Sequence, residues 1–149
     1  MKIGAPNRPG VFSAMEVAAS GLSAERSRMN VVAGNLANAR TTRTAEGGPY
    51  KRLDPVFTAK PLNPNSFDPV LRKVDTVQMT EVRPDPTPGA LVYEPGHPDA
   101  NADGYVEYPN VNVVTEMVNM MTASRAYEAG VTSIESLKAM ARAALRIGK

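Results

Sequence analysis

Proline is concentrated in one part of the chain, and this limits where long helices can form. Residues 41–109 contain eleven of the thirteen prolines. Proline lacks a backbone N–H and its ring clashes with the preceding helical turn, so it excludes long helices from this segment. We therefore expect three parts: an N-terminal helix within residues 1–40, an extended β/loop segment at 41–109 and a C-terminal helix within 110–149. The two helices should form one inner domain.

The N-terminal part carries an apolar residue at every seventh position: Met15, Leu22, Met29 and Leu36. A seven-residue apolar repeat is typical of helices that pack side by side in a coiled coil. Ser13 and Glu16 have the spacing of a capping box, in which each side chain bonds the other residue's backbone N–H. We therefore predict a helix from Ser13 to about Asn38.

Two glycines, Gly21 and Gly34, lie inside this predicted helix. Each lowers helix stability by up to ~1 kcal/mol relative to alanine. Because glycine lets another backbone approach closely, we expect these two residues to be positions of close packing.

The C-terminal part repeats the seven-residue pattern after Pro109, with Asn110 or Asn112 as the expected N-cap and Gly148 as the expected stop. The predicted fold is therefore mainly α with a small β or irregular middle, and the two helices are expected to pack as a coiled-coil-like layer. The apolar side chains that we predict to form a subunit interface are Met15, Leu22, Met29, Val32, Leu36, Val113, Met117, Met120, Tyr127, Val131, Ile134 and Leu137.

The proline-rich middle contains short runs with the composition of strands. The predicted strands are Tyr50–Ala59, Val74–Val82 and Leu91–Tyr93, of which the second is richest in Thr and Val. A turn is expected at Thr87–Ala90 and a loop at Asn63–Pro69.

Composition excludes several classes of protein. The chain has no Cys, which rules out disulfides, thiolate metal ligands and Cys nucleophiles. The net charge is +2 and the longest cationic cluster is Lys51-Arg52, so we expect no nucleic-acid partner. No apolar run approaches the ~18 residues of a membrane span, so no membrane insertion is expected. The N-terminus lacks the apolar run of a secretory signal, so we expect no signal cleavage.

Two motifs in the middle resemble binding or catalytic sites but lack essential parts. Asp99–Gly104 opens like a calcium loop, yet Asn110 stands where the bidentate Glu should be, so we expect a polar turn leading into the second helix. His97 is the single histidine and has no partner motif. We predict no catalytic, metal or cofactor-binding residue.

The length of the helices argues for packing between subunits. The two predicted helices measure ~39 Å and ~54 Å at 1.5 Å per residue. Pairing them with each other covers one side of each and leaves Ala14, Val17, Val31 and Ala37 in need of a neighbour. The periodicity alone also fits an intramolecular hairpin of two helices, but the middle is too small and too rich in proline to cover the remaining surface.

Several passages resemble proteins of the bacterial flagellum. Residues Ala19–Leu22 and Arg28–Ala39 are similar to the N-terminal signature shared by flagellar axial proteins. Residues Tyr93–Ala100 and Ala123–Ala129 resemble the middle and the second helix of the proximal-rod FlgC family. The resemblance covers nearly the whole chain. It departs from the family at Gly34 and Gly130, both of which replace an expected Asn.

The resemblance implies a structural subunit of the proximal rod, without enzymatic activity, that polymerises through its terminal helices into a hollow, torque-transmitting drive shaft. It implies partners among other rod subunits, copies of the same chain and the flagellar type III export apparatus. It also implies a location in the basal-body rod across the periplasm, reached without signal cleavage. The alternatives are another short flagellar rod protein, a non-flagellar coiled-coil adaptor, or a peptidoglycan-cleaving enzyme that uses Glu94, Asp99 and Glu107.

Overall fold

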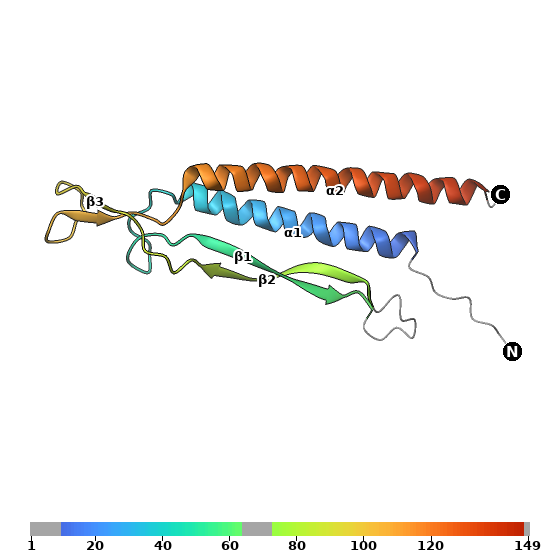
Figure 1. Cartoon of the computed structure of the whole chain (residues 1–149), viewed down its shortest axis with the longest axis horizontal. Coiled ribbons are helices and arrows are strands. Elements are labelled where there is room, and N and C mark those ends of the chain that lie inside the picture. Colours follow the sequence, from blue (N-terminus) through green and yellow to red (C-terminus); the bar gives the residue numbers. More distant parts are fainter. Residues whose placement is uncertain (1–9, 64–72, 148–149) are drawn as a thin grey trace. The chain divides into compact units, whose positions relative to one another are not determined.

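The computed structural model describes residues 10–63 and 73–147. Along these described residues, two long helices flank four strands, which confirms a mainly α fold with a small β middle (Figure 1). The elements are α1 (Val11–Ala37), β1 (Leu53–Pro61), β2 (Asp75–Pro84), β3 (Leu91–Tyr93), β4 (Tyr105–Glu107) and α2 (Val113–Ile147).

The chain divides into two compact units. Of the described residues, the first unit contains 10–26, 57–63, 73–80 and 124–147, and the second unit consists of Ser27–Val56 and Glu81–Ala123. Each helix contributes to both units, as do β1 and β2.

Helix α1 begins earlier than the sequence suggests. The carbonyl of Gly10 accepts a hydrogen bond from the N–H of Ala14 at 3.2 Å, so the first turn is already closed before Ser13. The predicted capping box at Ser13 is therefore wrong, because Ser13 lies inside the first turn. At the other end the N–H of Asn38 bonds the carbonyl of Gly34 at 3.1 Å, which agrees with the expected end near Asn38.

Helix α2 begins with a side-chain cap. The Oδ1 atom of Asn112 accepts the N–H of Thr115 at 3.0 Å, which confirms Asn112 as the N-cap. Asn110, the other candidate, instead accepts the N–H of Arg52 at 2.7 Å. The expected stop at Gly148 lies outside the described residues.

Strands β1 and β2 form one two-stranded sheet, and both overlap the predicted strands. Their ends are antiparallel: Leu62 N–H bonds the Val74 carbonyl at 2.9 Å, and Asp85 N–H bonds the Arg52 carbonyl. The predicted strand starts at Tyr50, whereas β1 starts at Leu53. The N–H of Tyr50 instead bonds the Thr41 carbonyl, in the turn after α1. The predicted loop at Asn63–Pro69 lies almost entirely outside the described residues.

A second two-stranded sheet, the β3–β4 hairpin, contains a strand that the sequence analysis missed. Leu91 pairs with Glu107, Val92 with Val106 and Tyr93 with Tyr105. The polar turn at Asp99–Gly104 was predicted to lead into the second helix. In the structure it leads into β4, which precedes α2. Gly104 has a φ of 81°, a left-handed conformation that glycine adopts without strain.

Few side chains of the described residues are fully buried. The buried apolar residues are Ala24, Val32, Val106, Pro109 and Ala123. Asn35 and Glu116, both 0% exposed, are the buried polar residues. No helix of the described part is long and apolar enough to cross a membrane.

Close packing between the helices occurs at a different glycine from those expected. In the first unit, a Cβ added to Gly130 would lie 2.7 Å from Cδ2 and 3.2 Å from Cγ of Leu22. Around Gly21 and Gly34 nothing lies within 4 Å of an added Cβ, so neither packs closely against another part of the chain. Gly130 is therefore the glycine that allows α2 to approach the Leu22 side chain of α1.

A pair of alanine substitutions separates this packing role from helix propensity. Gly21→Ala should raise the free energy of unfolding by up to ~1 kcal/mol, because alanine favours the helix. Gly130→Ala gains the same propensity, but overpacking against Leu22 should reduce stability by about 1–3 kcal/mol. Urea unfolding followed by circular dichroism measures both changes. Equal stabilisation by the two substitutions would show that the contact with Leu22 does not restrict the size of the side chain at position 130.

Candidate functional site

Asn35, near the end of α1, uses its full hydrogen-bonding capacity. Its Oδ1 accepts the backbone N–H of Leu53 at 2.9 Å and the hydroxyl of Tyr50 at 2.9 Å. Its Nδ2 donates to the backbone carbonyl of Leu53 at 2.9 Å and to Oε2 of Glu116 at 3.0 Å. The side-chain amide thus pairs with both backbone groups of Leu53, as a neighbouring strand would.

Glu116, in the first turn of α2, is a fully buried carboxylate with three donors. Its Oε2 accepts from Asn35, and its Oε1 accepts from Nε of Arg52 at 2.9 Å and from Nδ2 of Asn119 at 3.1 Å. Burial of an unpaired carboxylate is strongly unfavourable, so these three hydrogen-bond donors are what allows Glu116 to be buried. We refer to Asn35, Tyr50, Arg52, Glu116 and Asn119 as the Asn35–Glu116 cluster.

Arg52 supplies the positive charge of the Asn35–Glu116 cluster. It also contacts Asp54 through Nη1 at 2.6 Å, and Asp85 lies 3.9 Å from the same atom. Burial alone would lower the pKa of Arg52, but hydrogen bonds to Glu116 and Asp54 outweigh burial and raise it. Burial, followed by the charge of Glu116, also raises the pKa of Tyr50, so its hydroxyl stays protonated and donates to Asn35.

The Asn35–Glu116 cluster joins three elements of the second unit. It fixes the last turns of α1, the start of β1 and the first turn of α2 at one point. Both polar atoms of the Asn35 side chain and both carboxylate oxygens of Glu116 are engaged within the chain, so the arrangement suits positioning and not ligand binding.

The sequence analysis missed this cluster, although a signal was present. Asn35 follows Val32 by three residues, so the two lie on the same side of a helix, and both are buried. A lone amide on the apolar side of a helix indicates a specific hydrogen-bond partner. Its partner, Glu116, is 81 residues away and cannot be identified from local spacing.

The structure divides the predicted interface residues into three groups by exposure. Val113 and Met117 are exposed, whereas Val32 is buried within the chain. The remaining predicted interface side chains are half-buried: Met15, Leu22, Met29, Leu36, Met120, Tyr127, Val131, Ile134 and Leu137. Their role between subunits stays a prediction.

An exposed apolar stripe runs along the N-terminal part of α2, within the second unit. It consists of Val113, Val114, Met117, Val118 and Met121, which are between 47% and 71% exposed. Spacings of three and four residues place these side chains on one side of the helix. Glu116 and Ala123, both fully buried, lie on a different side.

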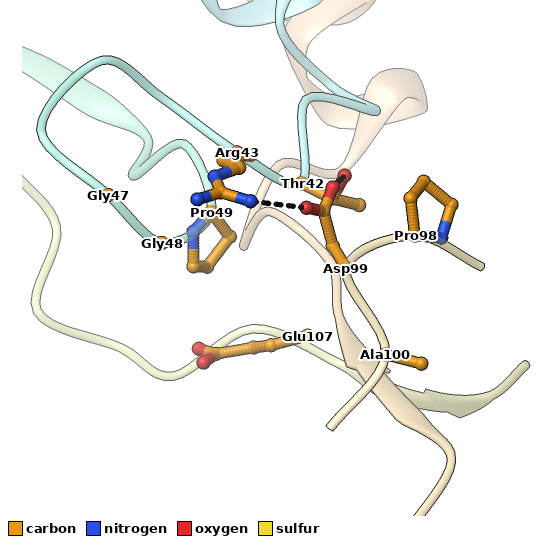
Figure 2. Close-up of a pocket in the computed structure, with 9 residues that line it drawn as sticks. All are labelled: Thr42, Arg43, Gly47, Gly48, Pro49, Pro98, Asp99, Ala100 and Glu107. Atoms are coloured by element: carbon orange, nitrogen blue, oxygen red, sulfur yellow. Dashed lines mark hydrogen bonds and ion pairs between the residues drawn. The ribbon is translucent and has the colours of Figure 1, made fainter. Parts of the chain in front are cut away.

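A pocket of about 400 Å³ in the second unit contains two of the three carboxylates considered for catalysis. Figure 2 shows Asp99 turned toward Thr42 and Arg43. Its Oδ2 accepts a hydrogen bond from the hydroxyl of Thr42 at 2.8 Å, and its Oδ1 forms an ion pair with Nη1 of Arg43 at 3.5 Å. The other pocket carboxylate, Glu107, pairs with Lys51 at 3.2 Å. The lining residues are Thr42, Arg43, Gly47, Gly48, Pro49, Pro98, Asp99, Ala100 and Glu107.

The third carboxylate, Glu94, accepts a hydrogen bond from the hydroxyl of Tyr108 at 3.1 Å. All three acids therefore have a partner within the chain. His97 is held in the loop as well, since its Nδ1 accepts the N–H of Asp99 at 3.1 Å. Among the described residues, no group of three or more acidic or histidine side chains is placed to hold a metal ion.

Comparison with known proteins identifies the family. Residues 15–43 match the family described as flagella basal body rod protein, and residues 102–147 match the flagellar basal body rod FlgEFG protein C-terminal family. A flagellar basal-body rod protein FlgC of Borreliella burgdorferi is 43% identical over 148 residues, which cover 93% of this chain and 97% of the relative. The chain belongs to the FlgC family.

Other members of the FlgC family show similar agreement. The FlgC proteins of Bacillus subtilis and of Escherichia coli O6:H1 are 39% and 38% identical, each over 93% of this chain and 98% of the relative. As a member of the FlgC family, the chain is a structural subunit of the flagellar basal-body rod. This confirms the family expected from the sequence and removes the non-flagellar adaptor as an alternative.

The Asn35–Glu116 cluster should contribute more to stability than a neighbouring amide with local contacts. Asn35→Ala should lower the free energy of unfolding by about 3 kcal/mol, because each buried polar group left unpaired costs ~1–3 kcal/mol. Asn38→Ala, the matched control, removes local bonds to Gly34 and Thr41 and should cost about 1 kcal/mol or less. Urea unfolding measures both variants. Similar losses in the two would contradict a special role for Asn35.

Glu107 should titrate below the ordinary range of a glutamate. Hydrogen bonds from Lys51 and from the N–H of Gly89 lower its pKa below the usual 4.5. The resulting stabilisation is present above the ordinary pKa and is lost as the pH falls through the lowered value. Carboxyl NMR titration should show that Lys51→Met raises the pKa of Glu107, whereas Lys60→Met leaves it unchanged. An unchanged value in Lys51→Met would contradict this assignment.

Proposed function

We propose that this rod subunit belongs to the proximal rod and polymerises through its terminal helices. The observation that supports this most directly is the exposed apolar stripe of α2. Burying one such side chain contributes about 1.5–3 kcal/mol. Five of them on one side of a helix provide a driving force for association that a single chain leaves unused.

In the assembly, the two helices of each copy form an inner, coiled-coil-like layer. The chain is then divided as residues 1–40, 41–109 and 110–149, with the middle part making the outer contacts. Such a layer surrounds a hollow channel and transmits torque along the rod. This proposal is supported by the half-buried side chains on both helices, which have one side in the chain and one side available to a neighbour.

The partners are other rod subunits and copies of the same chain, and the type III export apparatus carries each copy to the rod across the periplasm without signal cleavage. The proposed role is purely structural. The carboxylates Glu94, Asp99 and Glu107, which an enzymatic role would use, are each engaged by a side chain of the same chain.

A substitution on the apolar stripe tests the proposal without disturbing the buried residues. Met117→Asp should weaken each subunit contact about 30-fold, because ~2 kcal/mol of apolar burial is lost. The chain should fold normally, since Met117 is 54% exposed. Motility and the amount of subunit in isolated basal bodies should therefore fall, while the cellular level measured by immunoblot stays the same.

Thr122→Asp is the matched control, because Thr122 is exposed on the same helix and its hydroxyl donates a local hydrogen bond to the carbonyl of Val118. This variant should enter basal bodies normally. Normal rod assembly by Met117→Asp would exclude the apolar stripe as a subunit contact.

A further inference from the structure

The β3–β4 hairpin presents an aromatic face that its own chain leaves uncovered. Leu91, Tyr93 and Tyr105 are between 43% and 66% exposed. Alternation along the strands and the pairing of Tyr93 with Tyr105 place these three side chains on one face. The two tyrosine rings pack edge to face, with centroids 5.2 Å apart. On the other face Val106 is 1% exposed, whereas Val92, its partner in the hairpin, is 39% exposed.

The hairpin is also acidic. Residues 90–108 contain four carboxylates and no Lys or Arg. Arg43 compensates Asp99, and Lys51 compensates Glu107. The structure pairs no described cation with Glu94 or Asp103. The aromatic face is therefore accompanied by two negative charges that no cation of residues 10–63 and 73–147 pairs with, which favours a cationic binding partner.

The last turns of α2 have the opposite charge. Residues 136–147 contain three cations and no acid. Lys138, Arg142 and Arg146 are all exposed and follow one another at intervals of four residues. Like charges at this spacing destabilise a helix by ~0.2–0.5 kcal/mol per pair. The helix dipole favours a cation only in the last turn, which accounts for Arg146 but not for Lys138.

These cations share one side of the helix with an exposed apolar residue. At ~100° per residue, Lys138, Arg142 and Arg146 lie within about 80° of each other, and Leu145 lies beside Lys138. Leu145 is 74% exposed. We call these four residues the cationic face of α2. It combines three positive charges with one apolar side chain, the complement of the acidic and aromatic hairpin.

We propose that the aromatic face of the β3–β4 hairpin in one copy of the chain docks on the cationic face of α2 in a second copy. Guanidinium groups stack favourably on tyrosine rings, Leu145 contacts Leu91, and Asp103 and Glu94 pair with the cations. The proposal rests on the proposed function, since it identifies one contact of the same assembly. Because the two surfaces differ, the contact is head-to-tail and leaves a free surface at each end, as an open polymer requires.

Reversing one charge on each surface tests the contact. Self-association of the purified full-length chain is measured by sedimentation velocity at low and at high salt. Arg142→Glu and Asp103→Lys should each weaken association about tenfold or more, and high salt should weaken the wild type in the same direction. Arg125→Glu, which makes the same charge change at an exposed position earlier on α2, should behave as wild type.

A mixture of the two reversed variants provides the decisive measurement. The Arg142→Glu copy keeps a normal hairpin and the Asp103→Lys copy keeps a normal cationic face, so the mixture should associate more tightly than either variant alone. Failure of the mixture to associate, or a loss in Arg142→Glu without a loss in Asp103→Lys, would overturn the pairing.

The outcome also separates this contact from the proposed function. Wild-type association in both charge-reversed variants, together with a loss in Met117→Asp, would exclude the hairpin contact and leave polymerisation through the helices intact. Association that survives Met117→Asp but is lost in both charge-reversed variants would support the hairpin contact and exclude the apolar stripe.

Discussion

The second unit depends on the pairing of the Asn35 side chain with the backbone of Leu53 and with Glu116. This one amide fixes the position of the start of β1 relative to α1. Its hydrogen bond to Glu116 fixes the position of the first turn of α2 as well. An apolar contact tolerates sliding, whereas four directional hydrogen bonds do not. Buried polar groups of this kind fix the register of neighbouring elements, even where apolar residues would give equal stability.

The polar Asn35–Glu116 cluster goes together with a small apolar core. The buried apolar residues of the described part are small or branched, for example Ala24, Val32 and Ala123. Larger apolar side chains are left half-buried or exposed. A chain built in this way keeps its apolar surface for neighbours, which suits a subunit whose final environment is an assembly.

Local patterns in the sequence predicted the elements that local interactions determine. Both helices, the N-cap Asn112 and the strands near β1, β2 and β3 follow from periodicity, composition and capping. The capping box at Ser13 was wrong because Gly10 closes the first turn earlier. Strand β4 was missed because the polar turn at Asp99–Gly104 was expected to lead into the second helix. The Asn35–Glu116 cluster joins residues 81 positions apart, a distance that no spacing rule covers.

The seven-residue repeat alone could not separate the two sides of α2. A repeat identifies apolar positions but does not state which of them face the same chain. Met117 and Met120 were both predicted as interface residues, yet Met117 is exposed and Met120 is half-buried. Because successive residues turn by ~100°, these two lie about 60° apart on the helix. A helix of 35 residues can therefore use one side to pack within its own chain and an adjacent side to join a neighbour.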